Sequence, residues 1–181
     1  RVATAIARRV GLIEADTTAY RLINSEGDGL PGLTVDRFGD YLVSHVFSNA
    51  AAVLADAVYP DLMERTGAKG LYEQKRLRPA AGERRPPAEL RLGLAADPVQ
   101  EATEHGLRFA VDVTAPLGVG LFPDLREARR WVGLHASGRR VLNCFSYTGA
   151  FTVHAFAGGA THVTSVDLAS KSHTWARRNL Q

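Results

Sequence analysis

The chain has 181 residues, of which 45% are hydrophobic, and its net charge is +3. This composition is sufficient for a sizeable buried core. There is no apolar run of roughly 18 residues and no signal-peptide pattern, so we expect a cytoplasmic protein with no membrane contact, and the single cysteine excludes an internal disulfide.

The N-terminal half reads as a compact α+β unit. Apolar residues recur at helical spacing at Val2, Ile6, Val10 and Ile13, which predicts a first helix. In the segment 26–37, Asp28 and the glycines around Pro31 are typical of a turn rather than a site. Strand-forming residues at 33–38 and 41–47 flank a Gly-Asp pair and predict a hairpin.

Further elements follow in chain order. The pattern over 50–65 predicts a helix that kinks or restarts at Pro60, and 70–74 reads as a strand. A second hairpin is predicted from 99–103 and 107–113, and this unit should end near residue 114.

Two groups of basic residues, together with an isoelectric point of about 9.3, suggest a polyanionic partner. Each group can also be an ordinary solvated surface. The first lies in a proline-containing stretch that reads as a loop, and comprises Lys75, Arg76, Arg78, Arg84, Arg85 and Arg91. The second lies on and just after a helix, and comprises Arg129, Arg130, Arg139 and Arg140.

The segment 120–126 leads into that helix. Asp124 and Glu127 have the spacing of a capping pair at a helix start. Leu125, Ala128 and Val132 would then form the buried face of the helix.

Residues 141–149 and 163–167 predict a strand, a tight loop, a helix and a second strand that ends at Asp167. Gly149 allows a ligand to approach the backbone. Asp167 is placed to accept hydrogen bonds from both ribose hydroxyls of a cofactor, but it can equally cap the helix that begins near Ala169. Since the loop lacks the G-x-G-x-x-G spacing, a cofactor without a pyrophosphate, such as S-adenosylmethionine, fits better than a nicotinamide or a flavin.

No metal site is expected, because the six histidines show no ligand spacing and there is one cysteine. Cys144 lies in the first strand of the 141–167 motif. We interpret it as a small buried hydrophobic residue rather than a nucleophile.

Four segments, 26–37, 121–126, 143–149 and 165–168, resemble in order the RlmI-type ribosomal RNA methyltransferases, class I enzymes that use S-adenosylmethionine. The resemblance extends from about Tyr20 to Asn179. It implies α+β and α/β parts: a central α+β domain with an N-terminal linker helix over 1–114, and the first part of a Rossmann-like class I methyltransferase domain over 115–181. Because the family adds a PUA domain and a longer catalytic domain that carries the nucleophilic cysteine, we expect a fragment that is inactive alone, with its catalytic nucleophile beyond Gln181.

The resemblance also implies the residues that contact the cofactor. They are Phe122, Asp124, Arg126, Asn143, Phe145, Ser146, Tyr147, Thr148, Gly149, Asp167 and Leu168. At Gly118, Pro123 and Leu125 the chain departs from the family pattern, which has a lysine, a leucine and a glutamine there, so the polar contacts of those three are not expected.

By the same resemblance, the substrate is large-subunit ribosomal RNA and the product is 5-methylcytosine. Three alternatives stay open: methylation of guanine at N7, a nicotinamide-dependent oxidoreductase, and a non-catalytic RNA-binding adaptor. The oligomeric state is also open, with a homodimer among the candidates.

Overall fold

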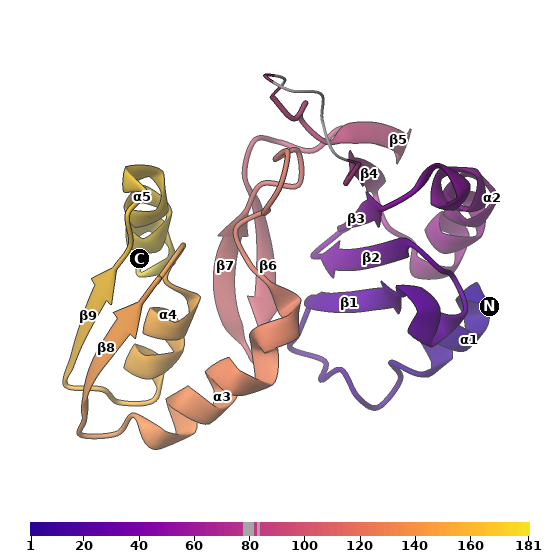
Figure 1. The fold of residues 1–181 in the computed structure, drawn as a ribbon. Helices are drawn as coiled ribbons and strands as arrows, with labels where there is room; N and C mark the ends of the chain where they lie inside the picture. Colours follow the sequence, from indigo (N-terminus) through magenta and orange to yellow (C-terminus); the bar gives the residue numbers. More distant parts are fainter. Residues whose placement is uncertain (78–81, 83) are drawn as a thin grey trace.

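The computed structural model describes residues 1–77, 82 and 84–181 and confirms a mixed α/β architecture (Figure 1). Within these residues the strands form three sheets. The first has five strands in the order β1 (Ala19–Asn24), β2 (Leu33–Phe38), β3 (Tyr41–Val46), β4 (Gly70–Lys75) and β5 (Glu89–Gly93). The second is the hairpin of β6 (Gln100–Glu104) and β7 (Leu107–Val111), and the third pairs β8 (Arg140–Cys144) with β9 (His162–Val166).

Both hairpins and the strand β4 agree with the predictions from sequence. β2 and β3 pair antiparallel around Gly39 and Asp40. β3 and β4 pair parallel, and the helix α2 (Asn49–Thr66) connects them. The strands β1 and β5 were not predicted. β5 falls in the stretch that we had interpreted as a basic loop.

The predicted interruption at Pro60 is wrong, because α2 runs unbroken through it. Proline removes one backbone hydrogen bond from a helix interior. Here the loss is offset by packing, since Tyr59 and Leu62 on either side of Pro60 are fully buried. The helix also has a good N-cap, because the Ser48 hydroxyl accepts a hydrogen bond from the Ala51 N–H at 3.1 Å.

The first helix is shorter than predicted: α1 covers Val2–Ala7, and Val10 is 78% exposed. The Arg9 side chain donates to the Ala5 carbonyl of α1 at 3.0 Å and to both carboxylate oxygens of Asp28, at 2.9 and 2.7 Å. Asp28 also accepts the Asn24 N–H at 2.7 Å, so its role in building a turn is confirmed.

The central sheet buries both faces, which explains why β2 and β3 are almost wholly buried. One face packs against α1 and α2 through residues such as Leu22, Val35 and Leu62. On the other face, Phe38, Val43 and Tyr72 pack in a second core that contains Phe109 of the hairpin.

The same second core continues into α4 (Ala150–Ala157) through Ala150 and Val153. In Figure 1 the hairpin β6–β7 accordingly lies between the central sheet and the β8–β9 pair. The boundary near residue 114 stays a prediction.

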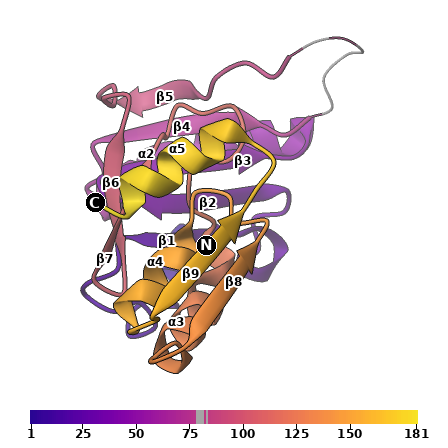
Figure 2. The same ribbon diagram turned by 90° about the vertical axis from the view of Figure 1, so that its left-hand side faces the viewer.

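The C-terminal part consists of a one-turn helix η2 (Pro123–Leu125), α3 (Arg126–His135), the parallel pair β8 and β9, α4, and α5 (Ser170–Asn179). Figure 2 shows β8 and β9 side by side, with α5 crossing toward the hairpin. No helix in the described ranges is both long and apolar enough to cross a bilayer.

Candidate cofactor-binding site

The loop after β8 has an unusual backbone. Phe145, Tyr147 and Gly149 have φ values of +57°, +48° and +77°. Positive φ is uncommon for bulky residues and is sustained only where the surroundings hold it.

Contacts with the end of β9 hold this loop in place. The Ser146 N–H donates to the Val166 carbonyl at 2.9 Å, and the Tyr147 N–H donates to Oδ2 of Asp167 at 2.8 Å. The second carboxylate oxygen of Asp167 accepts the Ala169 N–H at 2.9 Å. Asp167 thus joins the loop after β8 to the turn that begins α5.

These backbone hydrogen bonds, first from Ala169 and then from Tyr147, hold the pKa of Asp167 below its usual value. The carboxylate is therefore ionised at neutral pH. Each oxygen of an ionised carboxylate has two acceptor positions, so after the two backbone bonds Asp167 can still accept from both hydroxyls of a ribose. The capping interpretation and the ribose interpretation are compatible.

The segment 117–122 lies against the loop. The Tyr147 hydroxyl donates to the Gly118 carbonyl at 3.2 Å, and the Tyr147 and Phe122 rings pack with centroids 5.3 Å apart. A Cβ at position 118 would come within 2.8 Å of the Tyr147 hydroxyl and 3.2 Å of the Phe122 ring. Position 118, where the family pattern has a lysine, therefore leaves little room for a side chain in this chain.

Further bonds fix the loop to its neighbours. The Thr148 hydroxyl donates to the Gly120 carbonyl, and Asn179 of α5 donates to the Thr148 carbonyl at 2.9 Å. A cavity of about 260 Å³ lies beside these contacts, between the segment 115–120 and α5. Trp175 and Lys171 of α5 line it, and the sequence reasoning missed both.

One buried polar atom beside the loop has no partner. The Ser146 side chain is buried, yet its hydroxyl makes no hydrogen bond among the described residues. Buried polar groups in native proteins are normally paired. An unpaired hydroxyl beside an ionised carboxylate fits a ligand that carries hydroxyl and amino groups, as S-adenosylmethionine does.

The remaining predicted contacts are arranged less directly. Asn143 donates to the Thr152 hydroxyl at 2.9 Å, so its side chain faces α4 rather than the loop. Phe145 and Leu168 are almost fully exposed beyond the ends of β8 and β9. Arg126 donates to Glu127 at 3.0 Å, and Asp124 is exposed.

Three local predictions are wrong. No side chain caps η2 or α3, so Asp124 and Glu127 do not form a capping pair. Leu125 and Ala128 are exposed, and the residue that α3 buries is Arg129. Cys144 is exposed rather than buried.

The second basic group, which begins with Arg129, does not form one exposed surface. Arg129 is buried and donates to both oxygens of the buried Glu104, each at 2.6 Å, which removes it from any RNA-contacting set. Arg130 pairs with Glu14 at 3.0 Å, while Arg139 and Arg140 are exposed.

The first basic group is also divided. Arg91 lies in β5 and pairs with Glu73 at 2.7 Å and Asp56 at 2.6 Å, so it is structural. Arg78 lies outside the described residues. Among the described residues, no cluster of three or more His, Cys, Asp or Glu side chains has metal-binding geometry.

The fold and the strand-end loops define a class of protein, one that binds a nucleoside cofactor above two parallel strands. A family model described as S-adenosylmethionine-dependent methyltransferase matches residues 33–181. The chain belongs to this family, and its cofactor is S-adenosylmethionine.

The relatives with similar sequences confirm the predicted resemblance to RlmI-type methyltransferases. The chain is 37% identical over 167 residues to "Ribosomal RNA large subunit methyltransferase I" of Erwinia tasmaniensis, covering 90% of this chain and 41% of that protein. The protein of the same name from Escherichia coli O139:H28 is 35% identical over 167 residues, with the same coverage. The chain thus spans about two fifths of the length of these relatives.

The structural likeness is close. The crystal structure of SMU.776, described as a methyltransferase complexed with SAH, superposes with a TM-score of 0.87 at 30% identity. The match covers 99% of this chain and 46% of that one.

Proposed function

We propose that the protein binds S-adenosylmethionine across the carboxyl ends of β8 and β9 and transfers its methyl group to large-subunit ribosomal RNA. The observation that carries the cofactor site is the bond between the Tyr147 N–H and Asp167, which leaves acceptor positions free on an ionised carboxylate. The RNA substrate is supported by the names of the relatives.

In this proposal Asp167 accepts hydrogen bonds from the ribose hydroxyls. The Ser146 hydroxyl and the N-terminus of α4 face the electronegative amino-acid end of the cofactor. Phe122 and Leu168 offer apolar contacts, since both side chains are exposed beside the loop. The bound sulfonium supplies an already activated methyl group, so the protein mainly aligns donor and acceptor.

Cofactor binding is tested by titration calorimetry with S-adenosylmethionine, S-adenosylhomocysteine and NADH. We expect Asp167→Ala to weaken S-adenosylmethionine binding about 10- to 100-fold, the range for loss of hydrogen bonds to a charged group. Asp97→Ala, at an exposed position, is the matched control and should bind normally. Unchanged affinity for S-adenosylmethionine in a folded Asp167→Ala protein would rule out the ribose assignment. If the wild-type protein bound NADH more tightly than S-adenosylmethionine, the oxidoreductase would be favoured.

We infer 5-methylcytosine as the product. The test incubates the full-length enzyme with unmodified 23S ribosomal RNA, digests the RNA to nucleosides and identifies the methylated one by mass spectrometry. Recovery of 7-methylguanosine would replace cytosine by guanine as the target base. RNA binding without any methylated nucleoside would favour the adaptor.

A further inference from the structure

The face of the central sheet that lies opposite α1 and α2 is covered by the hairpin at one end and lines a cavity at the other. Side chains alternate between faces along a strand, so Phe38 and Val43, which lie under the hairpin, share their face with Thr34, Asp36 and His45. This second, polar end of the face lines a cavity of about 420 Å³, whose far wall is the segment 117–124. Its volume is in the usual range for small-molecule sites.

Inside the cavity the negative charge is already neutralised. Both oxygens of the buried Asp36 accept from Arg21, and His45 Nε2 lies 3.3 Å from Asp36 Oδ2. Asp36 therefore does not repel an anion from the cavity. Asp124, on the opposite wall, is the other carboxylate that lines it, and its side chain is exposed to solvent.

Arg76, by contrast, has no carboxylate within ion-pair distance among the described residues. Its guanidinium donates to His45 Nδ1 at 3.2 Å and to the Leu117 carbonyl at 3.1 Å, so it is aimed at the cavity wall from the end of β4. Burial and the positive charge of Arg85 lower the pKa of Arg76. A half-buried guanidinium beside a second arginine is a site that an anion would stabilise.

Two further observations indicate what accompanies the anion. Phe47 and Phe122, from opposite walls, are 52% and 50% exposed. The buried Thr34 hydroxyl, also in the lining, has no hydrogen-bond partner among the described residues. An aromatic platform, an arginine and an unpaired hydroxyl are the elements of a site for an unpaired nucleotide.

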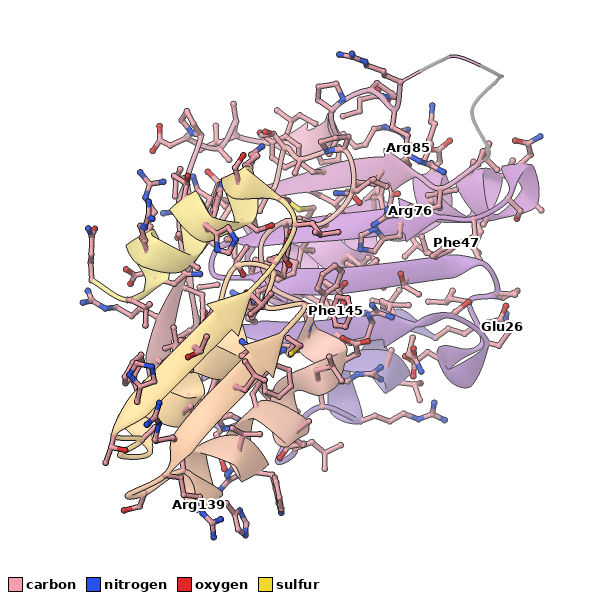
Figure 3. The ribbon with its side chains drawn as sticks, turned by 60° about the vertical axis from the view of Figure 1, so that its left-hand side comes forward. Glu26, Phe47, Arg76, Arg85, Arg139 and Phe145 are labelled. Carbon is pink, nitrogen blue, oxygen red and sulfur yellow. The ribbon has the colours of Figure 1, made fainter. Side chains whose placement is uncertain are left out.

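The position of the cavity agrees with such a ligand. Leu117, Gly118 and Val119 line it and also line the 260 Å³ cavity beside Tyr147, so one segment separates the two. Figure 3 shows Phe47 and Arg76 on the central sheet, and Arg139 at the opposite end of β8 from Phe145. A nucleotide held in the cavity would also meet Phe122, whose ring packs on Tyr147 of the cofactor loop.

We propose that this cavity is a subsite for one unpaired nucleotide of the RNA substrate, with its base against Phe47, its phosphate on Arg76 and a base or sugar group on the Thr34 hydroxyl. The subsite rests on the proposed function, because it takes RNA as the substrate. It adds a contact on the central sheet that lies outside the cofactor loop.

The test measures fluorescence anisotropy of a labelled single-stranded RNA of about 12 nucleotides with the full-length protein, over a series of salt concentrations. Arg76→Gln should weaken binding at least about fivefold and reduce the slope of log affinity against log salt by about 0.7, the share of one phosphate contact on a single strand. Phe47→Ala should weaken binding at least about fivefold with an unchanged slope, because stacking releases no counterions.

Two variants serve as controls. Arg139→Gln removes an exposed arginine outside the cavity and should leave affinity nearly unchanged. Thr34→Val removes an unpaired buried hydroxyl, so the protein should be no less stable to urea, yet bind RNA several-fold more weakly.

Binding of S-adenosylmethionine, measured on the same samples, should be unchanged in all four variants. Equal effects of Arg76→Gln and Arg139→Gln, or no effect of Phe47→Ala and Thr34→Val, would overturn the subsite and leave the proposed function intact. If the wild-type protein bound the cofactor but no RNA, the RNA substrate and the subsite would both fall.

Discussion

At the scale of single residues, the role of an arginine is decided by its neighbours rather than by its position in a basic run. Arg129 and Arg139 belong to one basic group in the sequence, yet one is buried against Glu104 and the other is exposed. Glu104 also lies 3.0 Å from His154 of α4, so a single carboxylate joins the hairpin to α3 and α4.

This buried group predicts a large effect of Glu104→Gln. The substitution leaves Arg129 as a buried charge without its partner, and we expect unfolding in urea to show a loss of about 3–5 kcal/mol. Glu101→Gln on the same hairpin is the matched control. Its exposed carboxylate lies 3.8 Å from Arg108, and its loss should be within about 1 kcal/mol. Equal effects of the two substitutions would contradict the structural role of Glu104.

The same carboxylate predicts a pH dependence. Burial raises the pKa of Glu104, but hydrogen bonds and charges from Arg129 and His154 outweigh it, so the pKa in the folded protein lies below 4.5. The stabilisation is present above pH 4.5 and is lost as the pH falls through the folded value. Urea unfolding between pH 7 and pH 3 should therefore show a decline in the wild type that is smaller in Glu104→Gln, and parallel curves would contradict this.

At the scale of elements, α3 and α4 approach each other through glycine. A Cβ on Gly158, just after α4, would lie 1.9 Å from the Gly133 carbonyl oxygen in α3. The backbone of Gly158 has a φ of −82°, so its requirement for glycine is steric rather than conformational. This contact sets the distance between the two helices beneath β8.

Gly158→Ala should therefore destabilise the protein by more than the roughly 1 kcal/mol expected for a left-handed glycine alone. Gly138→Ala is the comparison, because Gly138 has a φ of +71° but open space around it. Thermal unfolding should give the lower midpoint for Gly158→Ala. A lower midpoint for Gly138→Ala than for Gly158→Ala would show that α3 and α4 can separate without loss of stability.

The elements also indicate what a sequence can reveal. Both hairpins were predicted because their signals, alternating residues around a turn, are local. The strands β1 and β5 were missed because they are defined by partners in β2 and β4 and carry weak local patterns. In the candidate site, Gly149 and Asp167 were readable from one strand–loop–helix motif. The cavity at Thr34 and Arg76 was not, since it requires the pairing of distant strands and the return of segment 117–124.

At the scale of the whole molecule, two cores organise the chain. The first lies between the central sheet and its helices and contains Leu62. The second is centred on the hairpin and joins Phe38 of the central sheet to Val153 of α4 through Phe109. The cofactor loop and the central sheet are thus supported by one continuous apolar cluster.

This arrangement predicts which parts of the protein open together. Phe109 is almost completely buried, and truncation to alanine should destabilise the protein by about 3–5 kcal/mol. Hydrogen exchange measured by mass spectrometry should then rise in β2, β3 and α4 together, because the second core stabilises both the central sheet and α4. Leu62→Ala, a comparable truncation in the first core, should raise exchange in α2 and the central sheet more than in α4. If α4 kept its protection in Phe109→Ala, the hairpin would not couple the two sides, and the cofactor loop would depend on β8, β9 and their helices alone.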